Sequence, residues 1–446
     1  MTRIAIIGAG AAGSAAADRL RSLLGDEAEL VVLEAADRVG GRAHRVAFAG
    51  EVLEVGGTLM HSSNRRLLDA AARVGLGPAT DEVALGDETR AIGVWDGRRM
   101  LLRAGTKGWR FLAALVARYG LGNLRRLHRE AVTHVEAWNR VYDLQDAGAC
   151  WPDVASLLDA LGLAGAADAP LRALADRAGI SARTTDELAT GVLRNMYNQD
   201  AAIGGFAGIV GLAGAGLAGG SLFSLGEGNA TLFERLLAQA GAEVRLGTPV
   251  TAVSARDGRW EVRWDGGGET FDAVVVATPL VANPSGADPG LAGIACERLA
   301  PWAVAAGYRR VHVTLVEGRP APAGLDGRPV PCTLFTSGGE DFTSLGLVGH
   351  AAGSGLPVYK FFSHEALTDD VLDRYVPARR DVARLAWDAY PVLEPGAAQP
   401  PFRVAPGLYL ATALEAVVST METESVSAWN AAALLAADVR AGAPVA

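Results

Sequence analysis

Short apolar runs alternate with small-residue turns at the start of the chain. Residues 4–7 are apolar and mostly β-branched, and the run is too short for a helix, so it predicts a buried parallel strand. A helix is expected from Ser14 to about Leu24, and the apolar residues 30–33 predict a second buried strand. This order of strand, helix and strand is typical of an α/β fold built around a parallel sheet.

The middle of the chain has a helical pattern. From residue 108 to 193, apolar residues recur at spacings of three and four, as at Trp109 and Leu112, which predicts a helical insertion with these stripes in the core. Residues 201–226 carry no charge, but nine of them are glycines, so a buried helix followed by a strand is favoured over a membrane span. The polar and aromatic residues 194–199 fit either a substrate tunnel or a helix cap.

The second half of the chain is rich in predicted strands. A turn at residues 256–259 joins two strands of a hairpin, and the apolar residues 271–278 predict a buried strand that a proline ends. Residues 283–401 contain strand-like runs between Gly/Pro-rich turns, which favour an antiparallel sheet. The chain closes with a predicted strand at 407–412 and a helix at 421–435.

Three glycines follow the first strand with the spacing G-x-G-x-x-G. Gly8 allows a tight turn, Gly10 lets the backbone approach a pyrophosphate, and Gly13 lets the helix pack closely on the strand. The helix that follows directs its N–H groups and positive dipole end toward phosphates. Glu34, at the end of the second strand, can accept both ribose hydroxyls and would repel a 2′-phosphate. These features predict an adenine dinucleotide site, although the fingerprint alone does not separate NAD from FAD.

A second group of glycines and arginines follows Glu34. Gly40 and Gly41 would let the backbone approach a diphosphate, and Arg38 and Arg42 supply charged donors to it; a structural glycine turn with solvated arginines is the alternative. Further along, the pair Gly56 and Gly57, before Thr58, leaves space for a flat ring or ribityl chain. His61 is a weak catalytic candidate, because a lone histidine is more often a hydrogen-bonded structural residue.

Composition narrows the functional classes. The 446 residues carry a net charge of −9, and we find no basic stripe of the kind that nucleic acids require. The three widely spaced cysteines disfavour a disulfide framework or a cysteine-based zinc site and fit a reducing cytoplasm. The first strand begins close to Met1, so we expect no signal peptide. Arginine far outnumbers lysine, as in GC-rich, typically bacterial, genomes.

Along almost its whole length, the sequence resembles the prenylcysteine oxidase family, also called prenylcysteine lyase. The shared features are the glycine-rich start, a tyrosine-lysine-aromatic block and a terminal helix that begins with Met-Glu. The blocks that carry the resemblance are EVGGTLMH at 54–61, residues 119–124, FDAVVVATPL at 271–280, residues 314–316, YKFFSHEAL at 359–367, residues 389–391 and EAVVSTMETESVSAWN at 415–430.

The resemblance implies a Rossmann-like FAD-binding domain of the glutathione-reductase and amine-oxidase type, interleaved with an α+β substrate domain that carries the helical insertion. We expect the first domain to comprise residues 1–75, 225–282 and 402–446, and the second to comprise 76–224, largely helical, and 283–401, mainly antiparallel sheet. The residues expected to contact non-covalent FAD are Gly8, Gly10, Ala11, Ala12, Gly13, Glu34, Ala35, Arg38, Gly40, Gly41, Arg42, Gly56, Gly57, Thr58, Val250, Ala277, Thr278, Glu415, Thr420, Met421 and Glu422.

The family chemistry implied by the resemblance is oxidation of a thioether. A hydride leaves the carbon next to sulfur for the flavin, water adds, and the product collapses to an aldehyde and a thiol while O2 becomes H2O2. Such chemistry needs an apolar cavity and one ordered water, but neither a metal nor a covalent nucleophile. Lys360, among aromatic residues, is the first candidate for holding that water; Arg310 and His312, then His61, are weaker ones.

Several alternatives remain open at this point. Lys360 could instead be an interior lysine whose stem reaches solvent. The animal enzymes of the family are lysosomal and carry a signal sequence, whereas we expect this chain in the cytoplasm, so its apolar thioether substrate could be a small S-alkyl or S-prenyl metabolite. An amine oxidase, an isoprenoid desaturase and a non-enzymatic prenyl-binding escort protein are the rival functions. No integral membrane span is expected, and the oligomeric state is not predicted.

Overall fold

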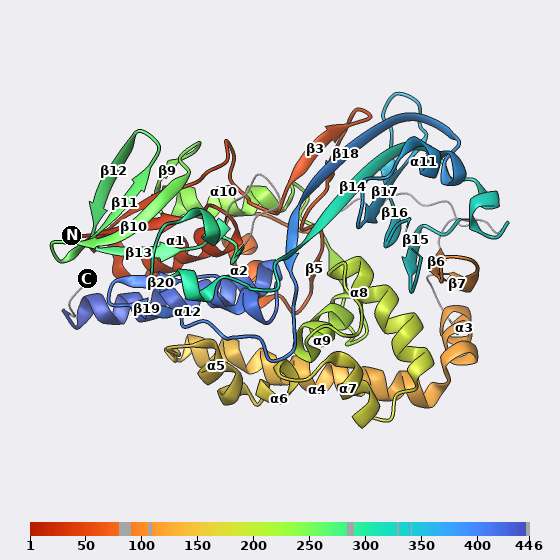
Figure 1. Cartoon of the computed structure of the whole chain (residues 1–446), viewed down its shortest axis with the longest axis horizontal. Coiled ribbons are helices and arrows are strands. Elements are labelled where there is room, and N and C mark those ends of the chain that lie inside the picture. The colour runs from red at the N-terminus through yellow and green to blue at the C-terminus, as the bar shows by residue number, and fades with distance from the viewer. Residues whose placement is uncertain (80–90, 106–108, 283–289, 328–329, 340, 443–446) are drawn as a thin grey trace.

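The computed structural model describes residues 1–79, 91–105, 109–282, 290–327, 330–339 and 341–442. Residue 108, where the helical insertion was expected to begin, residue 283, an expected domain boundary, and residue 446 lie outside these ranges. Figure 1 shows one half that holds both termini and a parallel sheet, and another half in which a long antiparallel sheet lies above a layer of helices.

The first half contains a six-stranded sheet in the order β19-β20-β13-β1-β2-β9. All neighbours are parallel except β19 and β20, which confirms the predicted α/β fold class. Because the central strands are covered on both faces, residues 4–7 of β1, 30–33 of β2 and all of β13 are apolar. The elements are β1 (Thr2–Ile7), β2 (Ala28–Leu33), β9 (Glu243–Arg245), β13 (Ala273–Val276), β19 (Arg403–Ala405), β20 (Leu408–Leu410), and the helices α1 (Ala11–Leu24), α10 (Asn229–Gln239) and α12 (Met421–Arg440).

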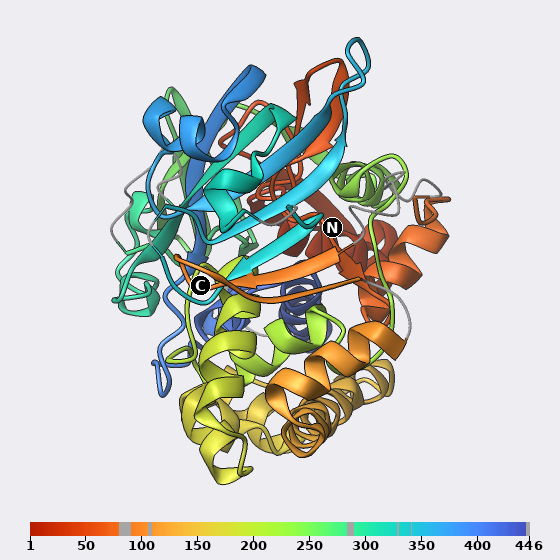
Figure 2. The ribbon, with the colours of Figure 1, turned by 90° about the vertical axis from the view of Figure 1, so that its right-hand side faces the viewer.

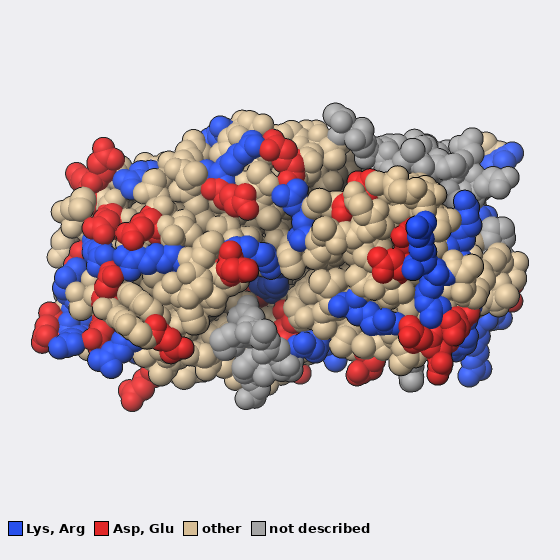
Figure 3. All heavy atoms as spheres, turned by 90° about the horizontal axis from the view of Figure 1, so that it is seen from above, with Lys and Arg blue, Asp and Glu red and all other residues tan. Residues whose placement is uncertain are grey.

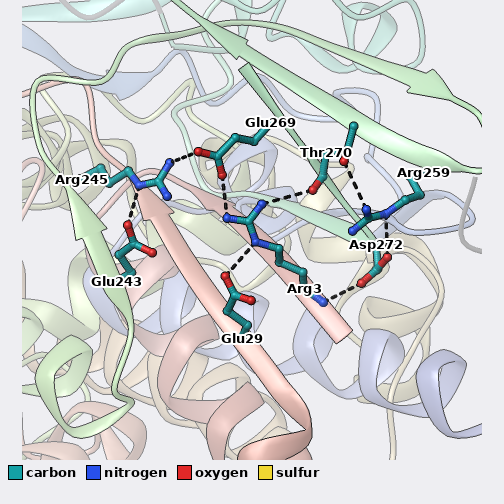
Figure 4. A network of polar contacts seen from close by, with 8 residues as sticks. All are labelled: Arg3, Glu29, Glu243, Arg245, Arg259, Glu269, Thr270 and Asp272. Carbon is teal, nitrogen blue, oxygen red and sulfur yellow. Dashed lines mark hydrogen bonds and ion pairs between the residues drawn. The ribbon is translucent and has the colours of Figure 1, made fainter. Parts of the chain in front are cut away.

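A three-stranded antiparallel sheet lies beside it and contains the predicted hairpin. Its strands are β10 (Val250–Arg256), β11 (Arg259–Trp264) and β12 (Gly267–Phe271). Charged side chains join this sheet to the parallel one, as Figure 4 shows: Arg3 on β1 donates to Glu29 at 2.8 Å and to Glu269 at 2.6 Å, and Arg245 donates to Glu269 at 2.8 Å. The network therefore links β1, β2, β9 and β12 at one edge of the fold.

The second half contains a seven-stranded sheet in the order β18-β14-β17-β16-β15-β6-β7. It is antiparallel, as expected for residues 283–401, except that β15 and β6 run parallel. Four of its strands, including the longest, were not predicted from the sequence. Its strands are β6 (Ala91–Trp95), β7 (Met100–Gly105), β14 (Tyr308–Arg319), β15 (Thr333–Thr336), β16 (Ser344–His350), β17 (Pro357–Ser363) and β18 (Ala378–Pro391).

The predicted helical insertion is present beneath this sheet. Its helices are α3 (Trp109–Tyr119), α4 (Leu121–Asp146), α5 (Val154–Leu161), α6 (Ala164–Ala167), α7 (Leu171–Arg177), a π-helical turn (Thr184–Ala189), α8 (Thr190–Met196) and α9 (Gly205–Gly214). As predicted, the uncharged run forms a buried helix, α9, and then a strand, β8 (Leu222–Phe223), of two residues only. Within the described ranges, none of the helices combines the length and apolarity that crossing a bilayer requires.

One expectation for the insertion was wrong. Trp109 and Leu112 were expected in the core because they follow a helical stripe, but their side chains are 74% and 55% exposed. The stripe of α4, by contrast, is buried at Trp138, Val141 and Tyr142. The periodicity is real in both helices, but in α3 Leu115 packs on the core, while Trp109 and Leu112 lie outside it.

Short elements connect the two halves. The strands β3 (Arg45–Phe48) and β4 (Glu51–Glu54) form a hairpin whose apolar side chains pack on the seven-stranded sheet. β5 (Met60–His61) pairs with β8. The other short elements are α2 (Arg65–Arg73), α11 (Asp369–Tyr375) and the 3₁₀ turns at Gly25–Glu27, Gly290–Gly293, Ala300–Trp302, Pro322–Leu325 and Ala413–Ala416.

Candidate active site

The first glycine loop lies between the end of β1 and the start of α1. Gly8 has φ +108°, and a Cβ there would lie 2.8 Å from the carbonyl oxygen of Ala277, while a Cβ on Gly13 would lie 1.9 Å from the carbonyl oxygen of Gly8. Gly10 is different, since the nearest atom to its Cβ would be 3.8 Å away. Gly8 and Gly13 are thus required by the fold, whereas Gly10 leaves open the space that a phosphate group needs.

Glu34 ends β2 next to this loop. Its two carboxylate oxygens accept hydrogen bonds from the backbone N–H groups of Ala9, at 2.7 Å, and Ala36, at 2.9 Å. These contacts fix the carboxylate beside the first loop, where a ribose is expected. Ala35, beside it, is exposed.

A second glycine loop rests on the first. The N–H of Gly40 donates to the carbonyl of Ala9 at 3.0 Å, and a Cβ on Gly41 would lie 3.3 Å from the Cα of Gly10. Arg38 donates to the carbonyl of Gly41 at 2.8 Å, and burial lowers the pKa of its guanidinium. The two loops therefore form one backbone surface with a cation at its edge.

Arg42 joins this surface to the rest of the molecule. Its guanidinium donates to the carbonyl of Ala389 on β18 at 2.8 Å and forms an ion pair with Glu415. Burial opposes the charge, but Glu415 and neighbouring groups outweigh it, so the pKa of Arg42 is raised. Glu415 also accepts from Tyr308 at 2.6 Å and from the N–H of Leu280 at 2.9 Å. Its carboxylate is thus committed to protein groups, and a direct contact with the cofactor stays a prediction.

The loop at residues 56–58 brings the start of α12 close. A Cβ on Gly56 would lie 1.9 Å from the carbonyl oxygen of Arg42, and one on Gly57 would lie 3.2 Å from the sulfur of Met421. Thr420 caps α12 by accepting from the N–H of Thr423 at 3.0 Å. The N-terminal end of a 20-residue helix therefore faces the glycine loops, where its dipole favours negative charge.

Glu422, on the same helix turn, points away from this surface. Its carboxylate accepts from the N–H groups of Arg66, at 2.9 Å, and Leu67, at 3.0 Å, and so caps α2. Burial raises the pKa of Glu422 to about 7, although these donors oppose the shift. Both oxygens thus have partners on α2, and the contact of Glu422 with the cofactor stays a prediction.

The remaining predicted contacts lie around the glycine loops. Ala11 and Ala12 form the first turn of α1, and Val250 begins β10. The N–H of Ala277 donates to the carbonyl of Ile7 at 2.8 Å, which holds Thr278 beside the first loop. The buried hydroxyl of Thr278 has no partner among the described residues, as expected for a group that a bound molecule would satisfy.

Lys360 lies on β17 and reaches the loop at residues 54–58. Its ammonium group donates to the carbonyl of Glu54 at 3.2 Å and to the hydroxyl of Thr58 at 3.3 Å, and it lies 5.0 Å from the ring centre of Phe362. Burial lowers the pKa of Lys360 to about 8, and Glu54 opposes the shift. Lys360 therefore lies beside the backbone surface that the glycine loops form, which we call the glycine surface. Its ammonium group loses a proton near physiological pH.

The other catalytic candidates do not meet Lys360. Across the β14–β17 pair, Lys360 is opposite Leu315 and His312 is opposite Ser363. Since side chains alternate along a strand, Arg310 and His312 lie on the opposite face of the sheet from Lys360. Arg310 forms an ion pair with Asp388 at 3.4 Å, and burial, with Arg310 nearby, lowers the pKa of His312.

His61 has a structural role in this geometry. Its two ring nitrogens lie 2.7 Å from the hydroxyl of Ser63 and 2.7 Å from the carbonyl of Gly219, so both are engaged. The polar cluster at 194–199 is also structural in part: Gln199 donates to the carbonyl of Pro391 at 3.0 Å and accepts from Leu393 at 3.0 Å.

Three further residues have contacts or burial of functional interest but were not predicted as site residues. Asn229, the first residue of α10, donates its side-chain N–H groups to the carbonyls of Gly57, at 2.8 Å, and Thr58, at 2.9 Å, and so holds that loop. Glu424 and Tyr197 are buried, and among the described residues their carboxylate oxygens and hydroxyl have no hydrogen-bonding partner. Burial, with Glu415 nearby, raises the pKa of Glu424. Glu424 lies in a block that carries the family resemblance and Tyr197 lies in the polar and aromatic cluster at 194–199, but neither was assigned a role from the sequence.

The residues present fit an adenine dinucleotide with a flavin ring. The glycine loops offer open backbone at Gly10, Glu34 offers acceptors to a ribose, and the start of α12 offers a positive dipole end. The hydroxyl of Thr278, which has no hydrogen-bonding partner among the described residues, supports the same assignment.

Comparisons with known proteins agree with this assignment. The family described as prenylcysteine lyase matches residues 105–443, and a family described as an NAD(P)-binding Rossmann-like domain matches residues 6–74. The farnesylcysteine lyase of Arabidopsis thaliana is 28% identical, over 97% of this chain and 87% of that protein. Prenylcysteine oxidase 1 of Pongo abelii is 26% identical, over 97% and 88%. A solved structure of putrescine oxidase bound to putrescine shares the fold, with a TM-score of 0.63, 16% identity and 99% coverage of both chains.

The fold, together with the glycine loops and the start of α12, defines an FAD-dependent oxidoreductase. Since the family match spans well over half of its length, the chain belongs to the prenylcysteine lyase family, as the sequence resemblance predicted.

Proposed function

We propose that the protein is a thioether oxidase that cleaves the C–S bond of an S-prenyl or S-alkyl cysteine-like substrate. In the net reaction, the thioether, water and O2 give a thiol, an aldehyde and H2O2. Relatives named farnesylcysteine lyase and prenylcysteine oxidase support the substrate class. The observation that carries the proposal is the buried Lys360 beside the glycine surface, in a family whose members bear those names.

FAD, when bound, would supply the two-electron acceptor for this oxidation. The protein must hold the substrate carbon in an apolar environment, since the carbon becomes cationic and any stray nucleophile would trap it. The face of the sheet that carries Lys360 is largely apolar, with Leu315, Val313 and Phe362 beside it. These side chains can exclude bulk water and leave one polar group to organise the water that reacts.

Lys360 would position that water. In its neutral form the amine can accept a hydrogen bond from water, and a pKa of about 8 makes that form accessible near neutral pH. The buried carboxyl of Glu424 is a second group that could take up or release a proton, since its pKa is raised and its oxygens have no partner among the described residues.

Anaerobic mixing with a panel of substrates tests the proposal. We expect S-farnesyl cysteine or a smaller S-alkyl cysteine to bleach the flavin absorbance, and thiol and aldehyde to form in equal amounts. Bleaching by putrescine or another amine, but by no thioether, would assign the protein to the amine oxidases. A yellow protein that binds thioethers without bleaching would instead support the prenyl-binding escort.

The electron acceptor and the compartment are secondary parts of the proposal. We expect O2 to reoxidise the flavin, which peroxide detection after aerobic turnover would check. A reducing cytoplasm agrees with cysteines 150, 296 and 332, all of which are free thiols.

A further inference from the structure

The stretch from residue 97 to residue 129 differs in charge from the rest of the chain. It holds nine basic residues and no acidic one, although the whole chain has a net charge of −9. One of the nine, Lys107, lies outside the described residues. Elsewhere the charges are mixed: on the face seen in Figure 3, acidic and basic side chains are interspersed over much of the surface. This stretch, formed by β7, α3 and the start of α4, is a local exception to the absence of a basic stripe noted in the sequence analysis, and we call it the basic surface.

This basic surface also carries the large exposed apolar side chains of the helical layer. Trp109 and Leu112 share one side of α3, three residues apart, and Leu121 at the start of α4 is 43% exposed. The guanidinium of Arg110 lies 5.8 Å from the ring centre of Trp109. Figures 1 and 2 show α3 at the end of the molecule remote from both termini, and none of the described elements lies over its outer side.

A hollow opens beside α3. It has a volume of about 310 Å³ and is lined by Arg99, Met100, Leu101, Arg118, Arg183 and Glu187. Arg118 forms a two-point ion pair with Glu187, at 2.6 Å and 2.9 Å, while Arg99 pairs with Asp96 at 3.2 Å. The three arginines outnumber the carboxylates of Glu187 and Asp96, and Arg183 is exposed. The hollow therefore has a net positive charge, which suits an anionic headgroup.

From these features we propose that α3 and the start of α4 dock the protein on the surface of an anionic lipid bilayer. Aromatic and aliphatic side chains flanked by arginines are what a helix in the bilayer interface presents, with its apolar side in the headgroup boundary and its cations among the phosphates. A second copy of this chain is a poor occupant, because two such basic surfaces repel. The helix would lie on the bilayer and not cross it.

Vesicle sedimentation of the FAD-loaded protein tests the proposal. We expect the protein to sediment with mixed phosphatidylcholine–phosphatidylserine vesicles, to remain in solution with phosphatidylcholine alone, and to be released by salt. The variant R110Q/R125Q/R129Q removes exposed charges and should weaken binding about a hundred-fold, at about five-fold for each basic residue. W109S/L112S should weaken it at least ten-fold, since it removes the apolar contact.

A matched control lies at the other end of the molecule. Leu246 is 43% exposed, and Arg256 and Arg263 are each 59% exposed, so L246S/R256Q/R263Q removes similar groups and should leave vesicle binding unchanged. Retained flavin absorbance in every variant verifies folding. Equal binding to neutral and anionic vesicles, or equal losses in the control variant, would overturn the proposal. Binding to heparin or an acidic peptide but to no vesicle would assign the surface to a soluble polyanion and also overturn it.

Discussion

The glycine loops and the seven-stranded sheet face each other across the candidate site, but they are built differently. In the first loop, the closest of these contacts joins residues close in sequence, since Gly13 meets Gly8, although Gly8 also meets Ala277 at the end of β13. In the sheet, Lys360 acquires its environment from Glu54 and Thr58, about 300 residues away. The first region is specified by local spacing, and the second by the register of distant strands.

The largest effect should come from Gly13→Ala. Its Cβ would lie 1.9 Å from the carbonyl oxygen of Gly8, so β1 and α1 must separate, and we expect unfolding to become easier by roughly 3 kcal/mol or more. Gly10→Ala is the matched control: its Cβ meets nothing closer than 3.8 Å, so stability should hold while FAD affinity falls. Thermal unfolding and flavin titration separate the two. Equal destabilisation by both changes would show that the loops do not divide structural and binding roles.

Lys360→Met should have the next largest effect. Without the water that Lys360 positions, hydride removal is not made irreversible by water addition, so net flavin reduction should slow by about a hundred-fold. In the wild type we expect the rate to rise with pH through an apparent pKa of about 8, because the neutral amine is the active form, and this step should be absent in the variant. Anaerobic stopped-flow across pH measures both.

His312→Gln serves as the comparison for this prediction, since His312 lies on the opposite face of the sheet. It should leave the rate of flavin reduction within a few-fold of wild type. If it slows reduction more than Lys360→Met does, the reacting carbon lies on the other face of the sheet, and our assignment of Lys360 is wrong.

The fold class, the glycine loops and Lys360 could be predicted because their evidence is local: a strand, a glycine spacing, one lysine among aromatics. The positions of Glu415 and Glu422 could not. Both lie in a segment that resembles a flavin-binding helix, but their carboxylates contact Arg42 and the start of α2, far away in sequence. Likewise, the exposure of Trp109 depends on which layer covers α3, which its own periodicity does not reveal.

Tyr308→Phe tests the link between the two regions. The tyrosine donates to Glu415 at 2.6 Å, and Glu415 pairs with Arg42. Removing a hydrogen bond to a buried carboxylate should lower the free energy of unfolding by about 2 kcal/mol. We also expect faster flavin loss, since Arg42 would be held less firmly. Denaturant unfolding and flavin release kinetics measure the two effects; unchanged values for both would mean that Arg42 does not need Glu415 in place.

The smallest expected effect is that of Glu269→Gln, remote from the site in the network of Figure 4. Arg245 and Arg3 lower the pKa of Glu269, so its contribution to stability is present above the carboxyl's ordinary pKa of 4.5 and is lost as pH falls through the lowered value. We expect a loss of about 1 kcal/mol at neutral pH, smaller in high salt, and no change in flavin reduction. Urea unfolding at neutral and acidic pH checks it; a loss that persists at acidic pH would contradict the ion-pair explanation.

The path of the chain has a consequence for anyone who wants to separate the two halves. The parallel sheet takes strands from residues 2–33, 243–276 and 403–410, whereas the antiparallel sheet takes its strands from residues 91–105 and 308–391. No single cut therefore releases an intact nucleotide-binding unit, and a fragment that ends between these strands lacks strands of at least one sheet. Expressing one half alone, or exchanging it for the same half of a relative, should therefore fail. Point substitutions in the full-length chain, insertions at exposed turns and circular permutation remain workable.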